Sequence, residues 1–273
     1  MLIDHPRLRE RLRYGLPYIY QGDSVKRIGW FTTARGPGSF NLFNTMIQRI
    51  EGGEINASLA FIFINRDVKG NPYRTKMIEM AKERGIPVII FPSDTFMPEL
   101  KERDIAAWRD EYGKGLRERI SVHKMDFGVL AGYMLIFDPE TCRKYTLINL
   151  HPALPETYKG TWEEIVGQVV DNGDASYGST VHLCTPKLDR GAPIAYDSFP
   201  LADLRERYHD KDQLVKEVRA RELKREAYLL METIRLMVDG DIRVENGSLL
   251  DRNGRKVLEM LSLAKEIDSM VRE

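Results

Sequence analysis

The sequence has very few cysteines: Cys142 and Cys184 are the only two among its 273 residues. Two thiols cannot complete a zinc cluster by themselves, and nothing in the sequence indicates a secreted, disulfide-bonded protein. The five histidines also lack the spacing to a second ligand that marks a metal site. We therefore expect both cysteines to be reduced core residues, and we expect no metal.

Long apolar runs are missing as well. No run approaches the roughly 18 apolar residues that a membrane-spanning helix requires. The first 25 residues are rich in arginine and tyrosine and lack the apolar core of a signal peptide. The sequence thus predicts a cytoplasmic protein that does not contact membranes.

Net charge is absent too, because 41 basic and 41 acidic side chains cancel. Such a chain has no overall field that would attract nucleic acid or an anionic membrane, so an anionic ligand requires a local site. We expect small-molecule substrates and no nucleic-acid partner. The oligomeric state stays open, a homodimer included.

What is present is an alternation of apolar and amphipathic segments. Apolar runs predict buried strands near residues 27–32, 59–64, 87–91, 127–131, 145–149, 179–184 and 194–199. Helical periodicity predicts helices from residue 40, within 94–123, and over 75–84, 162–170 and 214–237. This alternation is typical of an α/β fold with a doubly wound, mostly parallel sheet.

Two further features complete the predicted organisation. Asn246-Gly247 and Asn253-Gly254 indicate tight turns in a small hairpin after the long helix. No linker divides the chain, so we expect an extension over residues 1–25 followed by a single domain over residues 26–273.

An amide and an imidazole stand at the end of one predicted strand, in Asn149-Leu150-His151-Pro152. Ligands of open α/β sheets bind outside the carboxyl ends of the strands, and a spacing of two residues places both side chains on the same side. An oxyanion donor and a base so placed are suited to acyl transfer. A capping asparagine and a packed histidine are the structural alternative.

Asp189 lies in a second motif, Leu188-Asp189-Arg190-Gly191-Ala192-Pro193. In a turn of this composition an aspartate often only hydrogen-bonds its own backbone. Next to His151, its carboxylate would instead fix the tautomer of the imidazole and raise its pKa, which makes the charged form accessible near neutral pH. His182 alternates with apolar neighbours, so we expect a packed residue that borders the site.

A glycine turn, Gly36-Pro37-Gly38-Ser39, leads from the first strand into a helix. Backbone N–H groups at a helix N-terminus can hold a phosphate, although a plain turn is the alternative. Asn41 stands where a dinucleotide fingerprint has its third glycine, and the spacing and lysine of a P-loop are missing. The turn therefore argues against NAD and ATP.

Taken in order, these motifs resemble the folate-dependent formyltransferase family over roughly residues 26–256. The most specific stretches are residues 147–154, 172–174 and 178–194. The resemblance is strongest to the branch that formylates glycinamide ribonucleotide in purine biosynthesis. It implies a Rossmann-like formyltransferase fold that ends in a long helix and a small hairpin, with 10-formyltetrahydrofolate as co-substrate and no metal.

The resemblance also implies roles for particular residues. Asn149, His151 and Asp189 match the catalytic triad, and Gly38, Ser39 and Asn41 match the loop that binds the phosphate of the acceptor. Glu226, which periodicity alone places on a solvated helix face, matches a glutamate that holds the acceptor's amine. The positions implied for the folate and substrate pocket are Leu130, Ala131, Gly132, Tyr133, Met134, Leu135, His182 and Glu226.

The sequence departs from the family pattern at several positions. Leu135 stands where close relatives often carry an arginine, Ala153 replaces a common serine, and Trp162-Glu163-Glu164 lies where histidines are frequent. The glycine turn is one residue longer because of Phe40, and the segment over 94–124 is expanded. These departures leave open whether the folate pocket is altered.

Three other functions also stay open. The acceptor could be another small phosphorylated or sugar amine, or water could replace the amine in a hydrolase of formyl-folate. A catalytically silent ligand-binding domain could share the fold, because fold alone does not determine function. The presence of Asn149, His151 and Asp189 argues against a silent domain.

Overall fold

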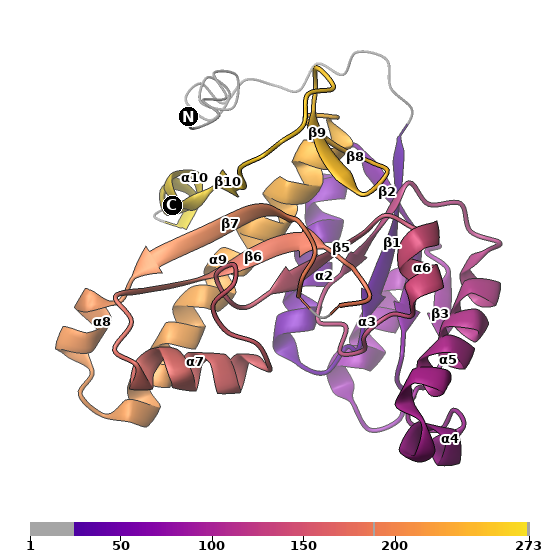
Figure 1. Cartoon of the computed structure of the whole chain (residues 1–273), viewed down its shortest axis with the longest axis horizontal. Helices are drawn as coiled ribbons and strands as arrows, with labels where there is room; N and C mark the ends of the chain where they lie inside the picture. Colours follow the sequence, from indigo (N-terminus) through magenta and orange to yellow (C-terminus); the bar gives the residue numbers. More distant parts are fainter. Residues whose placement is uncertain (1–24, 188, 272–273) are drawn as a thin grey trace.

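An eight-stranded sheet forms the centre of the computed structural model, which describes residues 25–187 and 189–271 (Figure 1). The expected extension over residues 1–25 lies, except for Val25, outside the described residues. In sheet order the strands are β10 (Leu261–Ser262), β7 (Pro193–Pro200), β6 (Ser176–Leu183), β5 (Leu147–His151), β4 (Phe127–Leu130), β1 (Lys26–Thr32), β2 (Ala57–Ile64) and β3 (Val88–Ile90).

β6 runs opposite to the other strands of this sheet. From β3 to β5 every neighbouring pair is parallel. β6 then runs antiparallel to both β5 and β7, and β10 pairs in parallel with β7. The predicted α/β fold with a mostly parallel sheet is confirmed.

Helices cover both faces of the sheet, as a doubly wound fold requires. One face packs against α2 (Pro37–Glu51), α3 (Pro72–Glu83), α9 (Lys211–Val238) and α10 (Ala264–Val271). The other face packs against α5 (Ile105–Ile120), next to the short helices α4 (Pro98–Arg103) and α6 (Pro139–Lys144). Adjacent residues of β1 show the alternation, because Trp30 belongs to the first core and Phe31 to the second.

A third, smaller core lies beside β6 and β7. There α7 (Trp162–Asp171) and α8 (Ala202–Arg207) pack with the first turns of α9 (Figure 1). Local signals begin these helices. The Thr161 hydroxyl accepts from the backbone of Glu164 at the start of α7, and the Asp210 carboxylate accepts from Gln213 at the start of α9.

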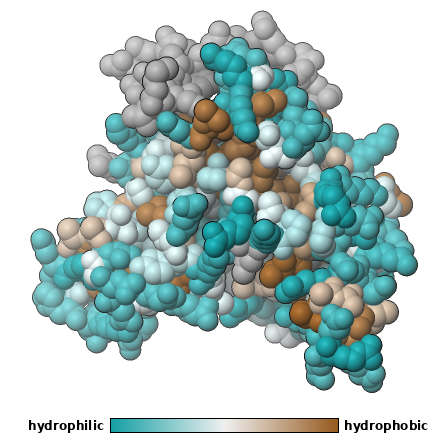
Figure 2. Space-filling model, in the orientation of Figure 1, coloured by the Kyte–Doolittle hydropathy of each residue, from teal (hydrophilic) through white to brown (hydrophobic). Residues whose placement is uncertain are grey.

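The predicted hairpin is present, formed by β8 (Ile242–Glu245) and β9 (Ser248–Asp251). Asn246 and Gly247 both adopt positive φ in its turn. Asn253-Gly254 makes a second turn beyond β9, where Leu250 bridges to Lys256. In Figure 2 hydrophilic residues cover much of the visible surface, and hydrophobic residues gather beneath this hairpin and in a second group at the lower right of the view. Within residues 25–187 and 189–271, no helix has the length and apolarity that crossing a membrane demands.

Candidate active site at the ends of the central strands

Asn149 and His151 lie in β5, at the point where this strand leaves the centre of the sheet. The antiparallel pairing with β6 places Asn149 opposite His182 and His151 opposite Thr180. Two segments that are distant in the sequence thereby lie side by side within the sheet. The strand pairing, rather than any local motif, brings His182 to the site.

The loop between β6 and β7 delivers Asp189. This loop folds back tightly on β6, because a Cβ on Gly191 would lie 1.6 Å from the carbonyl oxygen of Leu183. Asp189 itself has a φ of 50°, in the left-handed region that non-glycine residues seldom adopt. Strain of this kind often marks functional residues, and here it turns the carboxylate towards the histidines.

One carboxylate faces two imidazoles. Oδ2 of Asp189 lies 3.6 Å from Nδ1 of His151, and its Oδ1 lies 3.5 Å from Nε2 of His182. All three side chains are about nine-tenths buried. The structure thus places Asp189 against the histidines instead of leaving it as a plain turn residue.

Hydrogen-bond partners determine the tautomers of both histidines. Nδ1 of His182 donates to the carbonyl of Leu183 at 2.8 Å, so its Nε2 can accept a hydrogen bond from Nδ2 of Asn149 at 3.1 Å. Nε2 of His151 donates to the carbonyl of Tyr158 at 3.1 Å. Nδ1 of His151 is therefore the nitrogen that gains a proton next to Asp189.

The pKa of His151 corrects one expectation. Burial lowers this pKa, and the opposing effect of Asp189 does not compensate, so the imidazole is less basic than an exposed histidine. The paired carboxylate had been expected to raise it. For Asp189, burial acts to raise the pKa, but the neighbouring imidazoles outweigh it and leave the pKa below its usual value. The free site thus holds an ionised aspartate beside a neutral His151 near pH 7.

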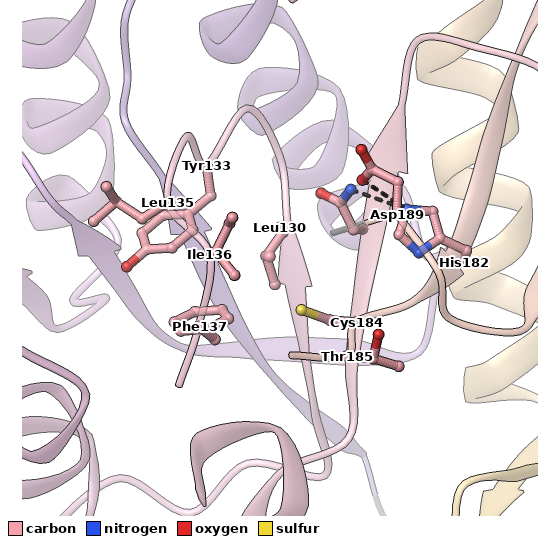
Figure 3. Close-up of a pocket in the computed structure, with 10 residues that line it drawn as sticks. Leu130, Tyr133, Leu135, Ile136, Phe137, His182, Cys184, Thr185 and Asp189 are labelled. Carbon is pink, nitrogen blue, oxygen red and sulfur yellow. Dashed lines mark hydrogen bonds and ion pairs between the residues drawn. The ribbon is translucent and has the colours of Figure 1, made fainter. Parts of the chain in front are cut away.

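A hollow opens beside these polar groups (Figure 3). Three residues expected in the folate pocket, Leu130, Tyr133 and Leu135, line one side of it, and His182 and Asp189 lie across from them. Its complete lining is Leu130, Tyr133, Leu135, Ile136, Phe137, Asn149, His182, Cys184, Thr185 and Asp189. The hollow is apolar on one side and polar on the other.

Some residues expected in this pocket lie elsewhere. Ala131 is fully buried, and Met134 is about half exposed; neither lines the hollow. Gly132 meets the glycine turn, since a Cβ on it would lie 3.4 Å from Cβ of Ser39. Sequence reasoning also missed Ile136, Phe137, Cys184 and Thr185, which continue the two segments that it had identified.

The glycine turn lies on the other side of the strand ends, where it begins α2. The Ser39 hydroxyl donates to the carbonyl of Gly36 at 2.9 Å, which closes the turn. Asn41 is exposed one step further along the helix. A Cβ on Gly38 would lie 3.9 Å from Nη2 of Arg219 and 4.0 Å from Oε1 of Glu226. Glu226 thus borders the turn and does not line the hollow.

Glu226 is buried, contrary to the exposed position that periodicity alone predicts. It shares Arg219 with Glu222: Nη1 of the arginine lies 2.6 Å from Glu222 Oε2 and 3.2 Å from Glu226 Oε2. Burial raises the pKa of Glu226 to about 7, helped by Glu222 and opposed by Arg219. Sequence reasoning missed Arg219 and Glu222, although their spacing places all three side chains on one helix face.

The cysteines and the possible metal ligands are the other reactive side chains. Cys142 and Cys184 are free thiols, half-buried rather than fully in the core. In the part of the chain that the structure describes, no three side chains of His, Cys, Asp or Glu are grouped as metal ligands.

Comparisons with known proteins identify the family. The formyl transferase family model matches residues 36–229. The phosphoribosylglycinamide formyltransferase of Haemophilus influenzae is 26% identical over 224 residues, which cover 81% of this chain and 92% of that protein. The enzyme of the same name from Escherichia coli is 31% identical over 167 residues, covering 60% of this chain and 70% of that protein.

Solved structures share the fold. The phosphoribosylglycinamide formyltransferase of Coxiella burnetii matches with a TM-score of 0.67 at 20% identity, over 88% of this chain and 99% of that one. A formyltetrahydrofolate deformylase from Pseudomonas syringae matches with a TM-score of 0.64 at 20% identity, over 84% of this chain and 66% of that one. The expected formyltransferase fold is confirmed, and the chain belongs to the formyl transferase family.

Proposed function

We propose that this enzyme transfers the formyl group of 10-formyltetrahydrofolate to the amine of glycinamide ribonucleotide, a one-carbon transfer of purine biosynthesis. The relatives from Haemophilus influenzae and Escherichia coli carry the name of this activity. The observation that carries the proposal is the position of Asp189 against His151 and His182, with Asn149 bound to His182. A cytoplasmic location, small-molecule substrates and a single domain over residues 26–273 remain parts of the same proposal.

The hollow would hold the formyl donor. Its apolar wall, which includes Leu130, Leu135 and Phe137, suits a flat pteridine ring, and its polar side carries Asn149 and Asp189. A formyl group bound at the polar side would lie next to Asn149 and Asp189, two members of the proposed triad.

The glycine turn would hold the phosphate of the acceptor. Gly38 and Ser39 occupy the first turn of α2, where backbone N–H groups have no partner within the helix, and Asn41 follows them. Glu226 borders the turn and would hold the acceptor's amine. Gly132, which follows β4, meets Ser39 of this turn, so the proposed acceptor site adjoins the segment that continues into the hollow.

The proposed reaction is a nucleophilic acyl transfer. The neutral amine attacks the formyl carbon and forms a C–N bond, and Asn149 donates to the developing oxyanion. Nδ1 of His151 accepts the proton that the amine loses, and Asp189 stabilises the resulting imidazolium. Collapse breaks the bond to N10 of the folate, and the proton passes to N10 directly or through water.

A spectrophotometric assay of tetrahydrofolate release tests the proposal. We expect release from 10-formyltetrahydrofolate only when glycinamide ribonucleotide is added. Release without any amine would mean hydrolysis, and release only with a different amine would mean another acceptor. No release with any amine would support a binding role and refute the proposal.

A further inference from the structure

We propose that Arg219 is a specificity-determining residue that makes the acceptor site select amines bearing a phosphate. The inference rests on the proposed function, since it concerns the same acceptor. It adds a side chain that no motif of the sequence indicated, and a physical reason why an acceptor without a phosphate would be a poor substrate.

The guanidinium of Arg219 lies between two buried carboxylates and the glycine turn. Both hydrogen bonds that it makes within the described ranges go through Nη1, to Glu222 and Glu226. Nη2 points to the turn, 3.9 Å from the place of a Cβ on Gly38. A phosphate held by the turn would thus meet Nη2, an N–H donor that makes no hydrogen bond to the described residues.

Neighbouring residues hold this guanidinium in place. Its central carbon lies 5.0 Å from the centre of the Trp162 ring, at the start of α7. The Ser179 hydroxyl of β6 donates to the other carboxylate oxygen of Glu222, Oε1, at 2.8 Å. Trp162 of α7 and the two carboxylates of α9 therefore restrain the arginine directly, and it would lose little freedom when it binds an anion.

The charges explain why the arginine is needed. The side chains of Glu222 and Glu226 are only 1% and 6% exposed, so their negative charge is poorly screened. A phosphate at Gly38 would be repelled by these carboxylates if Arg219 did not lie next to both. Arg219 also holds down the pKa of Glu226, so without it the site would have no cation beside the phosphate, whereas an acceptor without a phosphate would lose no such contact.

This difference between the two acceptors supplies a test that separates specificity from folding. Arg219→Gln is compared with the unmodified enzyme on glycinamide ribonucleotide and on its dephosphorylated riboside. We expect the preference for the ribonucleotide, which is the ratio of the two kcat/KM values, to fall about 10- to 100-fold. A fall by the same factor for both acceptors would mean a structural role and overturn the inference.

Two further variants serve as controls for this comparison. Arg219→Gln combined with Glu222→Gln removes one charge of each sign, which keeps the buried cluster balanced, and should show the same loss of selectivity. Arg221→Gln is the matched control, because Arg221 lies on the same helix and pairs with the half-exposed Asp203. An unchanged preference in the double variant, or an equal loss in the Arg221 variant, would contradict the inference.

A binding measurement separates this inference from the proposed reaction. Ribose 5-phosphate is titrated calorimetrically into the full chain and into the Arg219→Gln variant, with no folate present. We expect affinity to fall about 10- to 100-fold in the variant. If this occurs and no amine is formylated, only the proposed function fails. If glycinamide ribonucleotide is formylated and the variant keeps both its affinity and its preference, only the inference about Arg219 fails.

Discussion

Nδ2 of Asn149 donates a hydrogen bond to Nε2 of His182 at 3.1 Å. The imidazole can accept it because its Nδ1 donates to the carbonyl of Leu183. His182 therefore orients the amide of Asn149 and leaves the second N–H of that amide for the substrate. It is a positioning residue, acting through the asparagine.

Removing this acceptor should lower kcat by a larger factor than it raises KM for either substrate. We expect His182→Phe to lower kcat about 10- to 100-fold, because the amide of Asn149 loses its orientation. His182→Gln supplies a side-chain oxygen that can accept the same hydrogen bond, so it should retain more activity. Steady-state kinetics with both substrates measures this, and equal losses in the two variants would refute the positioning role.

The buried His151 should make stability depend on pH. Its pKa is lowered in the folded protein, so below the unfolded value of about 6.5 the unfolded chain binds a proton that the folded chain does not. The free energy of unfolding should therefore fall on acidification below that value, with a slope of up to about 1.4 kcal/mol per pH unit. Denaturant titrations between pH 7.5 and 5.5 should show a flatter dependence for His151→Gln, and identical slopes would contradict this account.

Glu226 should make acceptor binding depend on pH. Burial raises its pKa to about 7, so the carboxylate ionises as the pH rises through neutrality. If the ionised form holds the acceptor's amine, KM for glycinamide ribonucleotide should decrease between about pH 6 and about pH 8. Glu226→Gln should raise this KM and remove its pH dependence, whereas KM for the folate serves as the internal control. A pH dependence retained in the variant would assign it to another group.

Gly191 should be intolerant of substitution. Because an added Cβ would collide with the carbonyl of Leu183, Gly191→Ala must shift the loop that carries Asp189. We expect a loss of about 1–3 kcal/mol in the free energy of unfolding, together with a lower kcat. Gly167→Ala on α7 is the matched control, since its Cβ would meet nothing within 4 Å and alanine favours helix. Thermal denaturation and kinetics of both variants test the contrast.

The strands and main helices were predictable because buried parallel strands are continuous apolar runs and the long helix has a clear periodicity. α10 was not predicted, and neither was β10, whose two residues are too few to carry such a pattern. The short helices α4, α6 and α8 have six residues each, too few for a periodic signal.

In the site, Asn149, His151 and Asp189 were predictable as strand-end and turn residues. The direction of the pKa shift of His151 was not, because it depends on how completely the fold buries the imidazole. Arg219 was missed because an arginine on a long, charged helix is ordinarily exposed, and only the packing of α9 against β6 and the glycine turn buries its partners.

The central claim is that Asn149, His151 and Asp189 carry the transfer of the formyl group. Its most direct test is the single-turnover rate of formyl transfer to glycinamide ribonucleotide by Asn149→Ala, with the exposed Asn253→Ala as control. We expect the Asn149 variant to be about 100- to 1000-fold slower, because one oxyanion donor is lost, while both substrates still bind. A rate equal to that of the unmodified enzyme would contradict the account.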